Sequence, residues 1–225
     1  TPFKADGSVD VEALRGLVRF QIAGGIHGIV PCGSTGEAAT MNADEYRLVV
    51  RTVVEEANGA VPIIAGAGSN DTKKAIEFSK IAKECGASAL LHVNPYYNKP
   101  TPDGLFAHFK AIADAVDLPI IIYNVPGRTG LNMKAETVIR IAQGIPQVIG
   151  IKEASGDINQ MADIIKGTPE GFLVLSGDDS MTVPLMALGG VGCISVVANQ
   201  IPKEFSQMVS AALKGDWGTA RTMHF

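Results

Sequence analysis

Residues 148–155 read VIGIKEAS, and this stretch decides how the chain is expected to fold. Val148, Ile149 and Ile151 are β-branched residues, which favour a strand. The apolar run is continuous, as is typical of a strand buried on both faces of a parallel sheet. The run ends on Lys152, whose ammonium group is costly to bury unless it is paired or loses its proton. The position of this lysine therefore calls for a functional explanation.

Similar apolar runs recur along the chain, and they begin roughly 20–35 residues apart. They occupy residues 28–33, 62–68, 89–95, 119–126, 172–178 and 192–199. Helical patterns lie between them. Residues 42–58 begin with Asn42 as the expected N-cap, Glu45 follows three positions later, and Gly59 is the expected stop. Other helices are expected at residues 11–23, 70–85, 103–116, 134–143, 157–166, 180–188 and 202–214.

This alternation of strands and helices predicts an α/β fold with a parallel sheet. The repeat favours a (β/α)8 TIM barrel over an open doubly wound sheet, because no G-x-G-x-x-G follows the first strand. Only seven strands are recognisable, and only TPF precedes the helix at 11–23. We therefore expect strand 1 to be largely missing and the C-terminal helices to be truncated. Residues 1–225 are expected to form a single barrel domain, from the end of strand 1 through helix 8 and the start of the next helix.

Composition narrows the classes of function. The net charge of −4 and the absence of a basic run argue against nucleic acid as a partner. No apolar stretch reaches the roughly 18–20 residues that a membrane span needs. Cys32, Cys85 and Cys193 are too widely spaced for an obvious pair, and we interpret them as free thiols of a cytoplasmic protein.

In such barrels the active site lies at the carboxyl ends of the strands, so the polar residues there are candidates. They are Ser34 to Glu37, Ser69 and Asn70, Asn94 to Asn98, Tyr123 and Asn124, Arg128 and Thr129, Lys152 and Glu153, Asp178 and Asp179, and Asn199.

Lys152 is the only lysine expected at a strand end, and a lysine in a water-poor barrel mouth loses proton affinity. A neutral amine can attack a ketone and form a Schiff base, provided that another group moves the protons. Tyr123 suits that task, because it lies one strand earlier and adjacent strands are about 4.8 Å apart. The alternative is a structural ion pair. A pair with Glu153 is disfavoured, since successive strand residues point to opposite faces.

Two further segments could bind carboxylates. The GSTGE loop at 33–37 presents consecutive N–H groups and two hydroxyls, although it could be a plain turn. Arg128 could clamp a second carboxylate or simply lie on the surface.

The four histidines form no metal-binding pair, and Asp178 and Asp179 have no third ligand nearby in sequence. We therefore predict no metal and no cofactor, and a metal-dependent mechanism remains a weaker alternative.

Together these motifs resemble the dihydrodipicolinate synthase (4-hydroxy-tetrahydrodipicolinate synthase) family, within the pyruvate-dependent Schiff-base lyase and aldolase superfamily. The resemblance covers the whole chain. The motifs occur in family order: GSTGEAAT (33–40), NPYYNKP (94–100), YNVPGRTG (123–130), GIKEASGD (150–157) and SGDD (176–179).

The resemblance implies four catalytic residues. Lys152 would form the Schiff base with pyruvate, and Tyr123 would donate and accept protons. Ser34 would link Tyr123 to Tyr97, which would come from a neighbouring subunit of a homotetramer built as a dimer of dimers.

It also implies three substrate-binding residues. Thr35 would bind the pyruvate carboxylate, Arg128 would bind the carboxylate of aspartate 4-semialdehyde, and the carbonyl of Ile194 would lie near the pyruvyl group. The implied reaction is an aldol-type condensation followed by cyclisation, giving 4-hydroxy-tetrahydrodipicolinate in lysine and diaminopimelate biosynthesis.

Alternatives and departures remain. Ser34 stands where many synthases have threonine, and the sialate lyases also read GSTGE, so N-acetylneuraminate lyase or a 2-keto-3-deoxy sugar acid aldolase stays open. Arg128 favours the synthase. An inactive ligand-binding barrel is the non-enzyme alternative.

Lysine-inhibited members of the family tend to carry glutamate where this chain has Lys74, and often histidine where it has Tyr46. Weak or absent inhibition by lysine is therefore predicted.

Overall fold

A computed structural model describes all 225 residues and contains one six-stranded parallel sheet in the order β1-β2-β3-β4-β5-β6. The α/β fold class is therefore confirmed, because each strand pairs in parallel with the next one along the chain. The strands are β1 (Ile64–Gly66), β2 (Ala89–Val93), β3 (Ile120–Asn124), β4 (Val148–Glu153), β5 (Leu173–Ser176) and β6 (Gly192–Cys193).

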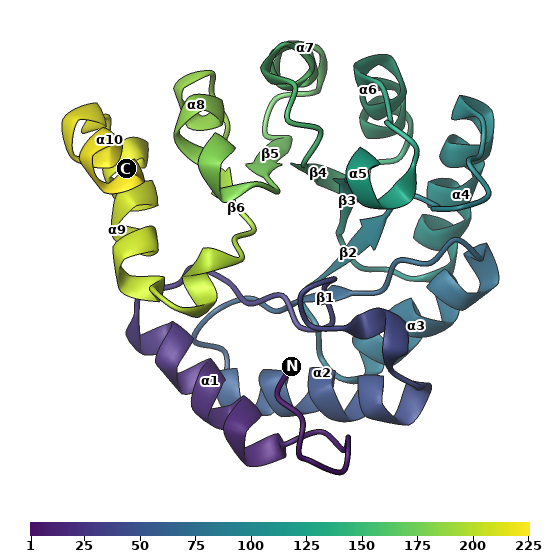
Figure 1. The fold of residues 1–225 in the computed structure, drawn as a ribbon. Helices are drawn as coiled ribbons and strands as arrows, with labels where there is room; N and C mark the ends of the chain where they lie inside the picture. Colours follow the sequence, from purple (N-terminus) through teal and green to yellow (C-terminus); the bar gives the residue numbers. More distant parts are fainter.

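The helices lie outside the sheet, and α3 to α8 connect its successive strands (Figure 1). They are α1 (Val11–Ala23), α2 (Ala43–Ala57), α3 (Thr72–Glu84), α4 (Pro102–Ala115), α5 (Pro126–Thr129), α6 (Ala135–Gly144), α7 (Ile158–Gly167), α8 (Thr182–Ala187), α9 (Pro202–Leu213) and α10 (Trp217–His224), with the 3-10 turns η1 (Ala38–Thr40), η2 (Asp179–Met181) and η3 (Val197–Asn199). The expected capping box is present, since Asn42 accepts from the backbone of Glu45 and the Glu45 side chain accepts from Asn42. None of the helices has both the length and the apolar character to span a bilayer.

Two predicted strands are shorter than expected. The run at 28–33 forms only an isolated bridge, Ile29 with Ile63, and Pro31 within it has no N–H to donate. The run at 192–199 is a strand only in β6, because the chain then turns into η3. The Asp179 carboxylate takes up the N–H groups of Val196 and Val197 that a longer strand would use in the sheet.

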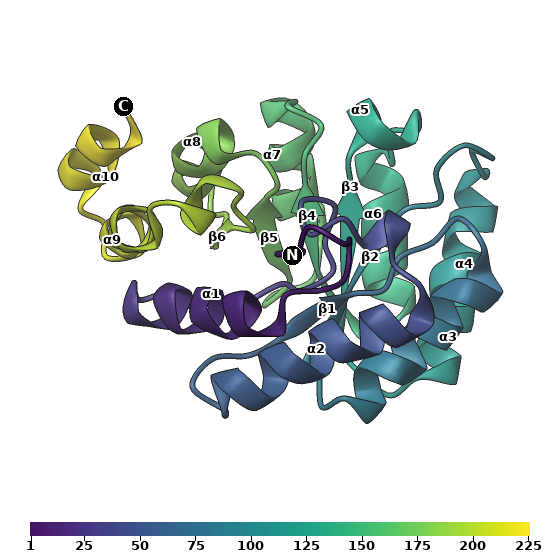
Figure 2. The same cartoon turned by 60° about the horizontal axis from the view of Figure 1, so that its bottom comes forward.

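The layer of helices curls until its two ends meet (Figure 2). Gln21 of α1 donates to the Ala198 carbonyl at 3.0 Å, and Ser206 of α9 donates to the Gly24 carbonyl at 2.8 Å. The main core, of 37 buried residues, lies largely between the sheet and the helices. A smaller cluster around Leu91 and Ile121 lies on the inner face of the sheet, so that face lines an interior space.

A β-bulge in β4 sets which side chains face that interior. Ile120 pairs with Val148 but Ile121 pairs with Gly150, so Ile149 is an extra residue in β4. Val148 and Ile151 consequently both pack in the outer core, whereas strict alternation would place them on opposite faces. The bulge thereby turns the next residue, Lys152, towards the interior.

Candidate active site

The interior space is a cavity of about 990 Å³ at which the loops after several strands converge. Its walls are mostly apolar, and a few polar side chains reach it, which is typical of a small-molecule site. Predicted site residues that line it are Ser34, Thr35, Tyr123, Arg128, Lys152 and Ile194. The fold therefore collects groups that are up to 160 residues apart in the chain, counted from Ser34 to Ile194.

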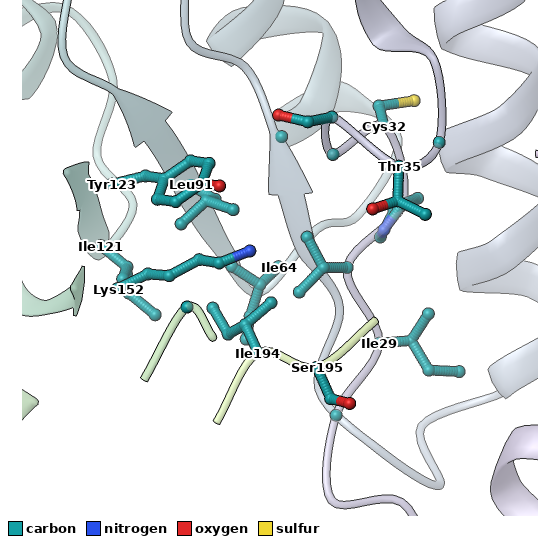
Figure 3. A pocket seen from close by; sticks show the side chains of 18 of the residues that line it. Ile29, Cys32, Thr35, Ile64, Leu91, Ile121, Tyr123, Lys152, Ile194 and Ser195 are labelled. Atoms are coloured by element: carbon teal, nitrogen blue, oxygen red, sulfur yellow. The ribbon is translucent and has the colours of Figure 1, made fainter. Parts of the chain in front are cut away.

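Lys152 extends from β4 into this cavity, beside the ring of Tyr123 (Figure 3). Its side chain is buried, and its Nζ lies 4.3 Å from the centroid of the Tyr123 ring. Burial lowers the pKa of the amine to about 8, with a smaller lowering from the Arg128 charge. Cys193 and Asp179 act in the opposite direction and favour the protonated amine. A large fraction of the amine is therefore neutral near pH 8.

Tyr123 is the direct neighbour of Lys152 across the sheet, because the two residues are partners in the β3–β4 register. Burial raises the pKa of the phenol. The Arg128 charge and the Ser34 hydroxyl both lower it in part, and all three residues line the same cavity. This geometry suits a phenol that passes a proton to and from a neighbouring nitrogen.

The GSTGE loop forms another wall of the cavity. The N–H groups of Ser34, Thr35 and Gly36 donate to no backbone acceptor and are therefore available to an anion. Gly66 lets the loop approach β1, since a Cβ there would lie 2.1 Å from the Cys32 carbonyl oxygen. The loop leads into the short η1 turn and not into a long helix.

Arg128 lies on α5, a single helical turn that the sequence did not predict. The Thr129 hydroxyl supports this turn by donating to the Leu131 carbonyl at 2.9 Å and to the Val125 carbonyl. Arg128 itself is exposed and lines the cavity, where a guanidinium can meet a carboxylate from solvent. Ile194 follows β6, and its N–H donates to the Ser176 carbonyl at 2.9 Å.

Tyr97 is the one predicted catalytic residue that does not reach the cavity of its own chain. Its side chain is 88% exposed, and its backbone adopts a left-handed conformation with φ 68°. The neighbouring Tyr96 lines the cavity instead. A role for Tyr97 therefore requires a second copy of the chain.

Glu153 lies on the opposite face of β4 from Lys152, which excludes the ion pair between them. Its buried carboxylate accepts from Asn124 Nδ2 at 3.0 Å, from the Ser155 N–H at 2.7 Å and from Gln160 Nε2 at 3.4 Å. Burial raises the pKa of Glu153, and these hydrogen bonds lower it in part. None of the six ion pairs in the structure involves Lys152.

Two buried histidines, His92 and His108, contact hydroxyl groups outside the cavity. His92 is fully buried and contacts Ser79 at 3.1 Å, and His108 contacts Thr72 at 2.9 Å. Burial lowers the pKa of His92 to about 3 and that of His108 to about 4. No three histidine, cysteine, aspartate or glutamate side chains form a group that could hold a metal ion.

Comparison with known proteins identifies the family that combines these features. The model of the Dihydrodipicolinate synthetase family matches residues 1–225. The chain belongs to this family.

The relatives agree along the whole chain. A 4-hydroxy-tetrahydrodipicolinate synthase of Maridesulfovibrio salexigens is 55% identical over 225 residues, which are 100% of this chain and 77% of the relative. A solved synthase from Aquifex aeolicus superposes with a TM-score of 0.97 at 44% identity, covering 100% of this chain and 76% of that chain. A chloride-inhibited synthase from Acinetobacter baumannii, complexed with pyruvate, superposes with a TM-score of 0.97 at 46% identity, with 100% and 77% covered.

Two further neighbours of Lys152 were not predicted as site residues. Cys193 was interpreted only as a free thiol, yet it lines the cavity and influences the pKa of the amine. Gly177 makes room for the lysine, since a Cβ there would lie 3.1 Å from Lys152 Cε and 2.7 Å from the Ala154 Cβ. The sequence signal that could have identified both residues is their position in the apolar runs 172–178 and 192–199, next to the expected carboxyl ends of strands.

Proposed function

We propose that this chain is a 4-hydroxy-tetrahydrodipicolinate synthase that condenses pyruvate with aspartate 4-semialdehyde through a Schiff base on Lys152. The observation that carries the proposal is a buried amine with a pKa of about 8, beside a phenol, in a cavity large enough for small substrates. The family of the chain and the name shared by its relatives support the same reaction.

In the first stage the neutral Lys152 amine attacks the ketone carbon of pyruvate. The resulting carbinolamine loses water and becomes an imine, and protons must move from nitrogen to the departing oxygen. Tyr123 is the proposed carrier of these protons, and the nearby Ser34 hydroxyl offers the next position along a relay. Loss of a methyl proton then converts the imine into a nucleophilic enamine.

In the second stage the enamine carbon attacks the aldehyde carbon of aspartate 4-semialdehyde, and the aldehyde oxygen takes up a proton. The amino group of this substrate then attacks the imine carbon and displaces Lys152. Ring closure releases 4-hydroxy-tetrahydrodipicolinate and regenerates the free amine. The protein needs no cofactor for this sequence, because the Lys152 nitrogen itself accepts the electrons of the breaking C–H bond.

The substrate carboxylates have separate proposed partners. Thr35 and the unpaired N–H groups of the GSTGE loop would bind pyruvate, with the Ile194 carbonyl near the pyruvyl group. Arg128 would bind the carboxylate of the aldehyde at the exposed side of the cavity. A sugar acid aldolase instead needs partners for a polyhydroxylated chain, and the arginine argues for the shorter, charged aldehyde.

We also propose the larger assembly. The six strands would belong to an eight-stranded barrel in which residues 1–225 form one domain, and the closed ring of helices supports this. Exposed Tyr97 would complete the cavity of a neighbouring copy within a homotetramer. One structural relative is a monomeric variant, so the assembly needs its own measurement. Three free cysteines fit a cytoplasmic location.

Weak or absent inhibition by lysine is also proposed. The Lys74 ammonium lies 5.6 Å from the centroid of the Phe78 ring, and Lys74 and Tyr46 both line the cavity. The positive charge of Lys74 would repel the amino groups of a lysine effector. Assay of the condensation with added lysine tests this, and inhibition at sub-millimolar lysine would contradict it.

The deciding experiment mixes the protein with pyruvate and borohydride and maps the adduct by mass spectrometry. A reduced pyruvyl adduct on Lys152 is expected, and its absence in folded protein would exclude the Schiff base. Product formation is then compared between aspartate 4-semialdehyde and sugar acid substrates. Chelator should leave the activity unchanged, since a metal-dependent aldolase would lose it.

A further inference from the structure

Asp179 begins η2, directly after Asp178, and its half-buried carboxylate is directed at the segment that follows β6. Asp179 Oδ2 accepts from the N–H groups of Val196 and Val197 at 3.3 and 3.0 Å. Asp179 Oδ1 accepts from the Cys193 thiol at 3.7 Å. One side chain thus contacts both ends of residues 193–197.

This segment forms a wall of the cavity next to the Lys152 amine (Figure 3). Ile194, Ser195 and Val196 all line the cavity. Only Gly192 and Cys193 are in the sheet, and the Ile194 N–H adds one hydrogen bond to the Ser176 carbonyl, so the residues beyond Ile194 lack a strand ladder to fix their position. The Asp179 carboxylate supplies fixed acceptors in its place, and hydrogen bonds to a charged acceptor are stronger than neutral ones.

We propose that Asp179 is a positioning residue for the Schiff-base reaction: it fixes residues 195–197 in the wall of the Lys152 cavity and contributes negative charge behind that wall. The inference rests on the proposed function. Asp178, its neighbour, has a different task, because its carboxylate accepts from the N–H and hydroxyl of Ser180. Asp178 itself lines the cavity, but only Asp179 accepts hydrogen bonds from the segment after β6.

The charge of Asp179 has a second effect. The Tyr123 ring of β3 lies beside the Lys152 amine, and Arg128 from α5, Cys193 from β6 and Asp179 from η2 act on its titration, while Asp178 also lines the cavity. Burial and Arg128 lower the pKa of the amine, while Cys193 and Asp179 raise it. Removing the Asp179 charge should therefore lower the pKa further. A residue that was merely structural would leave this titration unchanged.

The test compares Asp179→Asn, Asp179→Glu and the unmodified protein. Trace acetylation with acetic anhydride over a pH series, followed by mass spectrometry of the Lys152 peptide, reports the titration of the amine without any substrate. For Asp179→Asn we expect the labelling midpoint to move to lower pH. We also expect kcat to fall about 10- to 100-fold, as for a displaced catalytic geometry, with a smaller change in KM.

Asp179→Glu keeps the charge but displaces the carboxylate. The labelling midpoint should stay unchanged while kcat falls, so the two variants separate charge from position. The matched control is Asp157→Asn, since Asp157 also accepts two backbone N–H groups, those of Asn159 and Gln160, and does not line the cavity. It should leave both readouts unchanged.

Wild-type kcat together with a wild-type midpoint in Asp179→Asn would overturn the proposal. If that variant does not fold by circular dichroism, Asp179→Glu decides: wild-type kcat there overturns the positioning role. A protein that forms no borohydride-trapped pyruvate adduct would refute the proposed function, but the labelling series would still test the placement of Asp179.

Discussion

The two faces of the β3–β4 pair differ in how many hydrogen bonds their buried polar groups make. On the inner face, Tyr123 and Lys152 contact each other but make no ion pair, and the pKa of the lysine is lowered to about 8. On the outer face, one residue further along each strand, Asn124 donates to Glu153. That carboxylate has further donors in Ser155 and Gln160.

The difference shows how one pair of strands serves two purposes. Hydrogen bonds satisfy the buried groups on the outer face, so they fix the ends of both strands. The inner face leaves an amine without an ion-pair partner, which costs stability but keeps the nitrogen reactive. The four predictions that follow alter one face at a time.

The largest effect is expected for Lys152→Met, which removes the nucleophile. The rate of condensation should fall by about 10⁴-fold or more, and no pyruvate adduct should form. The variant should also be more stable at pH 7, by about 1–3 kcal/mol, because it removes a buried amine. Activity assays and urea unfolding measure both. Exposed Lys166→Met is the control and should change neither.

Tyr123→Phe removes the proton carrier and keeps the ring beside the amine. We expect kcat to fall about 10²- to 10³-fold, as for loss of a general acid–base group. The borohydride adduct on Lys152 should still form, but more slowly. Single-turnover trapping measures this rate, and an unchanged rate would remove Tyr123 from the mechanism.

Glu153→Ala alters the outer face alone. It leaves Asn124, Gln160 and the Ser155 N–H without their buried acceptor, so unfolding should become easier by about 2–4 kcal/mol. Urea unfolding followed by circular dichroism measures the change. Glu136→Ala, at an exposed position of α6, should stay within about 0.5 kcal/mol of the parent. An equal loss in both variants would refute the special status of the outer network.

The smallest effect is a pH dependence of stability. The folded pKa of Lys152, about 8, lies below its ordinary value of 10.5, so the unfolded chain binds more protons between these two pH values. Stability due to this group therefore rises with pH from about 8 to 10.5. The stability advantage of Lys152→Met should shrink over the same interval. An advantage that is constant with pH would mean that the amine is not destabilised by burial.

The sequence predicted much of this arrangement, because apolar runs and capping residues are local signals. The helix at 11–23 has the predicted bounds, and the strand order follows from regular alternation. The adjacency of Tyr123 and Lys152 was predicted from the strand order, and the β3–β4 register confirms it. Local signals could not predict η3 or the shortened β6, since these depend on the Asp179 carboxylate meeting residues 193–197 across the fold. The roles of all seven predicted site residues, Lys152, Tyr123, Ser34, Tyr97, Thr35, Arg128 and Ile194, stay predictions.

Because of the bulge at Ile149, the number of residues in β4 decides which of its side chains face the cavity. Substituting Ile149 changes one contact, whereas deleting it would shift every later residue of the strand to the opposite face. Lys152 would then point into the apolar layer of helices and Glu153 into the cavity. Chain length between Val148 and Lys152 is therefore constrained separately from the identity of the residues, and Gly150 allows the chain to bend there.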